Sequence, residues 1–408
     1  IGQRISGEKR ISYTRRGNPW KQLSTLYLGP GPLKPPAGSE HAKLELCLFY
    51  LARQRVPLLR LTQAQDSPSA IRDLGSLLGF VTRLLIGLHV WTFRKPDAPL
   101  PRVIERLPGA VPGLPAPEFI ELAAGRRGEA GASRRPMSST IEDPEQAVML
   151  RLTRYRAALP GARAILMLHG YSASGTTFAH HSVQPGPAKL LWDAGWDVWL
   201  LDMRTSAGMP TARLPWTFEE AALNDIPLAV DQVVRATGQA QIDVLAHCMG
   251  SVMLHMALLE PREQAYEHFY PLRRLLLGRI RRLVISQVTP KMIFSPTNTL
   301  RAFMMQHIRQ FLPLQDYAFR VEGSPGLLDQ LIDRLLASLP YPDEEFDIEN
   351  PPFPRWKKTP WTATRHRMDL LCGRDFAIKN VDQPVFDFID DHFGPLNMDT
   401  VAQAVNFA

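Results

Sequence analysis

The decapeptide Gln-Ile-Asp-Val-Leu-Ala-His-Cys-Met-Gly occupies residues 241–250 and decides the fold. Its apolar first half predicts a buried strand, and the run Ser251–Leu259 that follows predicts a helix. Small residues at Ala246 and Gly250 let the strand and the helix approach closely around the turn. A sharp turn of this kind lifts the side chain at its tip, here Cys248, into the open and aims backbone N–H groups at a reaction partner.

Alone, the decapeptide also fits an ordinary strand-to-helix junction in which Cys248 is a buried packing residue, since free Cys behaves as a small hydrophobe. The residues upstream favour the first interpretation. An apolar run at 164–168 ends in His-Gly, a second apolar run at 196–202 ends in charge, and a helical stretch at 189–194 separates them. Three strand–helix units in succession predict a parallel sheet. The alternating run 147–155 predicts a half-exposed strand at the edge of that sheet.

These motifs resemble those of the α/β-hydrolase superfamily, in the order and spacing of that family, over residues 141–294. The resemblance implies a mostly parallel sheet with helices on both faces, a helical cap after the sixth strand and a smaller N-terminal segment of mixed structure. The motifs that carry it are His169-Gly170, Asp202-Met203-Arg204 and Ala246-His247-Cys248-Met249-Gly250.

The resemblance also implies a role for each matching residue. Cys248 is expected to be the nucleophile, and the backbone N–H groups of Tyr171 and Met249 are expected to form the oxyanion hole. The N–H after the nucleophile lies at a helix N-terminus, where unpaired N–H groups and the helix dipole favour negative charge. Cysteine replaces the serine common in the superfamily, as in dienelactone-hydrolase-like enzymes. Residues expected to support the loop and the turn are His169, Gly170, His247, Gly250 and Asp202.

A narrower resemblance concerns the hydrolase-like region fused behind flavin oxidoreductases of the cholesterol-oxidase type. It is carried by residues 168–175, 201–206 and 246–251, and the segment Gly7–Tyr13 resembles the part that joins the two. It implies a fused or partner flavin oxidoreductase domain and an alternative function as a non-catalytic accessory or lipid-presenting module. This chain itself has no glycine-rich phosphate loop, so we expect no cofactor here.

The expected acid and histidine of a catalytic triad are missing from their usual place. After Arg281–Gln287, which predicts a strand, no further run predicts a buried strand, whereas the superfamily places both residues after two more strands. We therefore expect both to lie beyond Ala408, in a protein cut at both ends, since the chain starts at Ile1 without a signal peptide. An internal alternative for the base is His392, which has carboxylate neighbours.

The C-terminal part instead predicts a helical cap. Helical patterns cover 298–311, 326–339 and 385–393, with a proline-rich stretch from 340 to 360. Apolar cap residues are expected to line a pocket for an acyl or sterol group, so the predicted substrate is a small ester, thioester or lipid with an apolar acyl part. These residues are Phe294, Phe303, Met304 and Met305.

The composition of the chain predicts how it is divided into domains. The 408 residues are 45% hydrophobic, enough for two or three domains. Proline- and glycine-rich stretches place the boundaries, which gives an accessory segment (1–95), a linker (96–140), a hydrolase core (141–295) and a cap (296–408). Three widely spaced cysteines exclude a disulfide framework and a metal-ligand cluster and indicate a reducing compartment, the cytoplasm.

The two parts of the chain differ in net charge. Residues 1–140 carry 21 Lys and Arg against 10 Asp and Glu, whereas the remainder carries 26 against 30. The basic side chains are scattered, which argues against nucleic acid. We expect an ordinary solvated surface, with a membrane surface or an acidic partner domain as the alternative contacts. The apolar run Ser76–Phe93 predicts a packing helix, with a lipid-touching helix and a membrane span as alternatives that Arg83 makes costly.

Overall fold

The computed structural model describes most of the centre of the chain and parts of both ends. Contacts divide the chain into two compact units, residues 1–98 with 323–383 and residues 99–322 with 384–408. This division differs from the expected plan, because the C-terminal region is shared between the units. The described residues are 5–8, 25–30, 42–45, 75–76, 79, 96, 98–99, 101–126, 147–259, 270–287, 316–321, 323, 325–337, 362–372 and 381–405.

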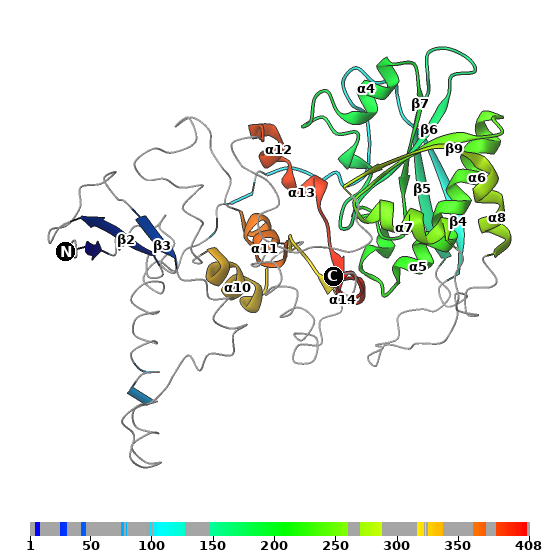
Figure 1. The fold of residues 1–408 in the computed structure, drawn as a ribbon. Coiled ribbons are helices and arrows are strands. Elements are labelled where there is room, and N and C mark those ends of the chain that lie inside the picture. Colours follow the sequence, from blue (N-terminus) through cyan, green and yellow to red (C-terminus); the bar gives the residue numbers. More distant parts are fainter. Residues whose placement is uncertain are drawn as a thin grey trace. The chain divides into compact units, whose positions relative to one another are not determined.

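The second unit is built on a six-stranded, mostly parallel sheet (Figure 1). Strands β7, β6, β8 and β9 run parallel to one another, whereas β5 is antiparallel to β7 and β4 is antiparallel to β5. In spatial order the strands are β4 (Glu118–Arg126), β5 (Ala147–Tyr155), β7 (Asp197–Asp202), β6 (Ala164–Leu168), β8 (Ile242–His247) and β9 (Ile280–Ser286). The sheet expected from the sequence is confirmed, and each expected strand lies within one or two residues of its predicted range.

Helices cover both faces of this sheet, as expected (Figure 1). Strands β6 and β7 are buried along their whole length, which explains why their sequences are continuous apolar runs rather than alternating ones. One face packs against α4, and the opposite face packs against α6, α7 and α8. These helices are α4 (Pro187–Asp193), α6 (Ile226–Thr237), α7 (Met249–Leu258) and α8 (Tyr270–Arg279).

Strand β4 lies inside the segment expected to be a linker. It pairs with β5 from Glu118 to Arg126 and takes the edge position that the sequence assigned to residues 147–155. Side chains from both strands enter the core, among them Ala124 and Leu150. The hydrolase core therefore begins well before residue 141, and β5 is an inner strand.

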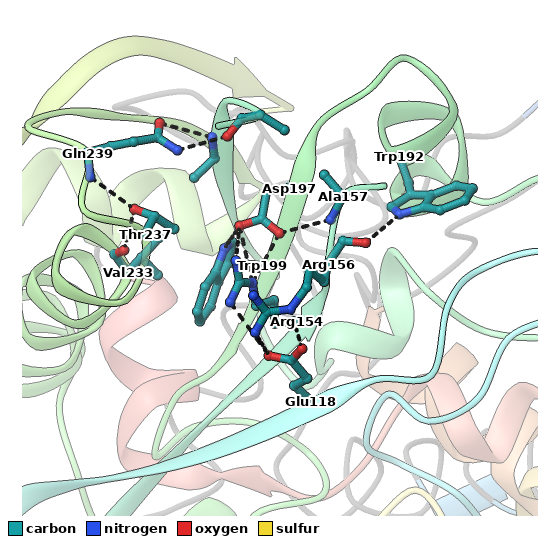
Figure 2. Close-up of polar contacts among 12 residues, drawn as sticks. Glu118, Arg154, Arg156, Ala157, Trp192, Asp197, Trp199, Val233, Thr237 and Gln239 are labelled. Carbon is teal, nitrogen blue, oxygen red and sulfur yellow. Dashed lines mark hydrogen bonds and ion pairs between the residues drawn. The ribbon is translucent and has the colours of Figure 1, made fainter. Parts of the chain in front are cut away.

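At the amino edge of the sheet, where β6, β7 and β8 begin, charged side chains are paired (Figure 2). The Arg154 guanidinium lies 2.8 Å from the Asp197 carboxylate and 3.5 Å from Glu118. The indole N–H of Trp199 also donates to Asp197, at 2.9 Å. Asp197 and Arg154 are buried, so these contacts supply partners for two charges that water does not reach.

The C-terminal segment of the second unit packs on the core rather than forming one continuous cap helix. The helix expected over 385–393 is divided at Phe388 into α12 (Gln383–Asp387) and α13 (Ile389–His392). Next come the short strand β11 (Leu396–Asn397) and the helix α14 (Met398–Val405). Strand β11 pairs with β10 (Asp316–Tyr317).

The first unit contains a small antiparallel sheet and two helices joined by ion pairs. The sheet has the order β1 (Ile5–Glu8), β2 (Thr25–Pro30) and β3 (Ala42–Glu45). Helix α10 (Leu327–Ala337) confirms the helix expected over 326–339 and pairs Asp333 with Arg367 of α11 (Ala363–Cys372) at 2.5 Å.

Several predictions concern residues outside the described ranges. These are the helix at 298–311, the four apolar cap residues and almost all of Ser76–Phe93. Where the structure is described, no helix combines the length and the apolar character that crossing a membrane requires.

Candidate active site

The candidate active site lies at the carboxyl edge of the sheet, where β6, β7 and β8 end. Cys248 forms the turn between β8 and α7 and has φ 54° and ψ −127°. A positive φ is uncommon for a residue other than glycine and strains the backbone. The Cys248 N–H donates to the Ser286 carbonyl oxygen of β9 at 2.9 Å, and the Cys248 carbonyl accepts from the Ser251 N–H at 2.9 Å. The turn is thus held from both sides.

Two glycines let neighbouring backbone come close to this turn. A Cβ at Gly250 would collide with the carbonyl oxygen of His169 and would lie 3.0 Å from that of Leu168. A Cβ at Gly170 would lie 3.0 Å from the Cβ of Cys248 and 3.5 Å from its sulfur. The end of β6 therefore lies directly against Cys248, and it leads into Tyr171.

The Met249 N–H, which the sequence predicts to be an oxyanion donor, lies at the N-terminus of α7. Met249 is the first residue of α7, so no earlier turn of the helix supplies a carbonyl for its N–H. Cys248 is partly exposed, whereas Met249 and Gly250 are buried. A partly exposed cysteine therefore lies beside a helix N-terminus that favours negative charge.

The C-terminal segment fixes the loop that carries Tyr171. Ser172, which also has a positive φ of 57°, donates its hydroxyl to the Gly394 carbonyl oxygen at 2.8 Å. In return the Gly394 N–H donates to the Ser172 carbonyl at 3.0 Å. The Tyr171 hydroxyl bonds to the Asn397 carbonyl oxygen at 2.9 Å and to the Thr400 hydroxyl at 2.5 Å. We call these contacts the C-terminal clasp.

The clasp was missed from the sequence. Gly394, Asn397 and Thr400 lie more than two hundred residues from the loop they hold, and no local pattern marks them. The only local signal is the turn composition Gly394-Pro395, which predicts a turn without naming its partner.

His169 is fully buried and has no nitrogen left for Cys248. Its Nδ1–H donates to the Gly170 carbonyl oxygen at 2.7 Å, and its Nε2 accepts from the Ser206 hydroxyl through a short contact. Burial lowers the pKa of His169 to about 4, so the ring is neutral at pH 7. These contacts agree with the supporting role expected for His169.

Asp202 orders the neighbouring loop. Its Oδ1 accepts from the Gly175 N–H at 2.8 Å. Arg204, two residues further along the chain, forms an ion pair with Asp225 at 2.7 Å. Burial raises the pKa of Asp202 to about 7, although the Gly175 N–H and Ser206 oppose the rise.

His247 precedes the nucleophile position and faces the next strand. Its Nδ1 lies 3.3 Å from the Ser286 hydroxyl, and burial lowers its pKa. Because β8 and β9 pair at His247 and Ser286, this contact joins the ends of two neighbouring strands. Such a position suits the supporting role expected from the sequence.

His392, the internal alternative for the base, belongs to a separate buried cluster. Its Nε2 lies 2.9 Å from the Ser182 hydroxyl, which in turn lies 2.7 Å from His180 Nδ1. His180 Nε2 lies 3.2 Å from Asp391, which also binds Arg102. Burial lowers the pKa of His392 to about 4.

The described residues thus bring Cys248, Gly170, Gly250, Met249 and the Tyr171 loop together without a general base. Among them, no histidine ring is hydrogen-bonded to the Cys248 thiol. The same residues include no cluster of three or more His, Cys, Asp or Glu side chains arranged to hold a metal ion.

Comparison with known proteins agrees with this geometry. Residues 163–266 match the family model described as alpha/beta hydrolase fold. This range contains β6, α4, β7, α6, β8 and α7, the elements that build the candidate site. The core of the chain therefore has the α/β-hydrolase fold.

Two lipases show partial sequence similarity to the chain. Gastric triacylglycerol lipase of Homo sapiens is 32% identical over 103 residues, which are 23% of this chain and 26% of that protein. Lipase lipl-3 of Caenorhabditis elegans is 28% identical over 99 residues, which are 22% of this chain and 24% of that protein. The chain thus matches about a quarter of the length of these relatives.

Among solved structures, epoxide hydrolase A of Mycobacterium thermoresistibile is similar at 16% sequence identity and a TM-score of 0.29. The similar region covers 64% of this chain and 72% of that one.

Proposed function

We propose that the protein is a carboxylic ester hydrolase of the esterase or lipase type that acts through Cys248. The observation that carries the proposal is the strained backbone of Cys248 at the strand-to-helix turn, with φ 54°. Strain of this kind persists only where the surroundings impose it, and it is concentrated at functional sites. The sequence similarity of one quarter of the chain to gastric triacylglycerol lipase supports an ester with an apolar acyl part as substrate.

The reaction would form an acyl-enzyme. The Cys248 sulfur, as thiolate, attacks the carbonyl carbon, and the N–H groups of Tyr171 and Met249 stabilise the negative charge on the carbonyl oxygen. Collapse of this intermediate breaks the ester C–O bond, and the departing alkoxide takes a proton from water. A thioester on Cys248 remains, and a water molecule must hydrolyse it to complete a cycle.

One observation favours a second function. The described residues supply no base for the water that would hydrolyse the thioester, so the turn would serve equally as scaffold in a non-catalytic accessory or lipid-presenting module. Such a module would accompany a flavin oxidoreductase of the cholesterol-oxidase type. In that case Cys248 would be a packing residue and would react slowly with iodoacetamide.

The experiment is incubation with p-nitrophenyl butyrate followed by mass spectrometry of the cysteine peptides. The ester hydrolase proposal expects release of p-nitrophenol with a butyryl group on Cys248 and none on Cys47 or Cys372, which are internal controls. Cys248→Ala should release nothing above background. Sustained turnover lost in Cys248→Ala would support the enzyme and reveal a base within the chain. Absence of both product and adduct would overturn the proposal and favour the accessory module.

A further inference from the structure

A cavity of about 1080 Å³ lies in the second unit. Its walls are the extended segment 102–110, the strands β4 and β5, the loop 207–213 and Pro395. Neither Cys248 nor Tyr171 nor Met249 is among the residues that line it. A cavity of this size accommodates a small organic molecule.

The charged side chains of the cavity are mostly cationic. Arg102, Arg106, Arg151 and Arg213 line it, and Glu105 is the acidic residue among its walls. Arg102 is bound to the buried Asp391 at 2.6 Å, so its charge is largely compensated. Arg106 donates to the Asp390 carbonyl oxygen at 3.2 Å, and Arg213 lies 3.8 Å from Asp316.

Arg151 supplies a donor that the protein leaves unused. Its guanidinium stacks over the Phe119 ring at 3.9 Å, and one Nη donates to the Pro108 carbonyl oxygen at 2.9 Å. The Arg151 Nε is buried and has no hydrogen-bond partner. Leaving a buried donor unpaired is unfavourable, and an acceptor oxygen from a ligand would remove that cost.

The remaining wall is apolar. Ile104, Leu107, Phe119 and Met209 contribute hydrophobic side chains next to the arginines. A guanidinium binds planar carboxylates through paired hydrogen bonds, and an aliphatic chain gains by leaving water for such a wall. From this combination we propose that the cavity binds a carboxylate joined to an apolar chain.

The site is separate from the nucleophile but connected to its loop. Strand β5, which carries Arg151, is separated from β8 by β7 and β6, a distance of about 14 Å at the usual strand spacing. Ala207 of the cavity wall donates its N–H to the Ala173 carbonyl at 2.9 Å, and Pro395 follows Gly394 of the clasp. A ligand in this cavity would therefore contact Ala207, which is hydrogen-bonded to the Tyr171 loop, and Pro395, which adjoins the C-terminal clasp. It would not reach Cys248.

Equilibrium binding to the full chain carrying Cys248→Ala tests this proposal without involving the proposed chemistry. Decanoate, methyl decanoate, decyl phosphate and inorganic phosphate are titrated by calorimetry. Decanoate should bind saturably and the neutral methyl ester should not. Equal binding of the methyl ester would overturn the anion site, and equal binding of inorganic phosphate would overturn the apolar part. Binding of decyl phosphate better than decanoate would show that the head group is not a carboxylate.

Substitutions of single arginines test whether decanoate binds in this cavity. Arg151→Gln should weaken decanoate binding by about tenfold. Arg213→Gln, at a partly exposed position, should weaken it without risk to folding. The matched control is Arg235→Gln, because Arg235 is exposed on α6, does not line the cavity and pairs with Asp231 of its own helix at 2.8 Å. Decanoate affinity unchanged in both cavity variants would overturn the assignment.

Discussion

The two edges of the central sheet use polar residues in opposite ways. At the amino edge, Arg154, Asp197 and Glu118 form ion pairs that compensate one another (Figure 2). At the carboxyl edge, Asp202 and His169 are fully buried without a charged partner at hydrogen-bond distance, and Cys248 has a strained backbone. The amino edge pairs its charged groups with one another, whereas the carboxyl edge combines buried groups that lack a charged partner with a strained backbone, a combination typical of functional sites.

The largest effect is expected from breaking the amino edge. Asp197→Ala removes the closer of the two carboxylate partners of the buried Arg154 guanidinium and the acceptor of the Trp199 N–H, which should lower the free energy of unfolding by about 4 kcal/mol. The rate at which iodoacetamide alkylates Cys248 should not change below the melting temperature, because Asp197 lies at the other end of β7. Chemical denaturation and peptide mass spectrometry measure the two quantities. Slower alkylation in the folded variant would contradict the separation of the edges.

Gly250→Ala perturbs the carboxyl edge and should change both the free energy of unfolding and the rate of Cys248 alkylation. The added methyl group meets the carbonyl oxygens of His169 and Leu168, which belong to backbone and cannot rotate away. We expect a loss of about 3 kcal/mol and a changed rate of Cys248 alkylation. Gly278→Ala is the matched control, since its Cβ would meet nothing within 4 Å. A Gly250→Ala protein as stable as the control would contradict the close approach.

Asp202→Asn tests the buried acid at the carboxyl edge. Burial raises the pKa of folded Asp202 to about 7, whereas an aspartate in an unfolded chain titrates near ~3.9. Between these values the folded state binds more protons, so its stability falls by about 1.4 kcal/mol for each pH unit of increase. The stability of Asp202→Asn relative to the parent should therefore rise from pH 4 to pH 7 and then level off. Denaturation curves at several pH values measure it, and a constant difference would refute it.

Tyr171→Phe should have the smallest effect on stability. It removes the hydroxyl contacts with Asn397 and Thr400, for a loss of about 1 kcal/mol. Acylation of Cys248 by the ester should slow, because the loop is less firmly held. Tyr155→Phe is the control: its buried hydroxyl donates to the Gly109 carbonyl at 2.6 Å, away from the clasp. Equal effects of both variants on acylation would show that the clasp does not position the loop.

The sequence predicted those parts of the molecule that short-range patterns determine. Strands β6, β7 and β8 are buried on both faces, so their apolar runs are continuous and easily recognised. The turn at Cys248 is also local, because its small neighbours are within two residues of it. Strand β4 was missed because proline- and glycine-rich segments on either side of Glu118–Arg126 obscure a short alternating run.

Long-range contacts at the site were not predictable in this way. Tyr171 was selected for its backbone N–H, yet its side chain bonds to residues that no pattern connects with it. His392 has the acidic neighbours expected of a catalytic base, but its ring turns toward Ser182. Which of several histidines faces a thiol depends on how distant segments pack, and spacing along one chain does not contain that information.

The hydrogen bonds between Ser172 and Gly394 also have a consequence for biosynthesis. They join residues 222 positions apart, a contact of high sequence separation that forms late when a chain folds. A ribosome exposes the strands and the cysteine turn long before it releases Gly394. The nascent chain can therefore assemble the sheet before the Tyr171 loop is fixed, and the loop would be fixed only after Gly394 has been synthesised.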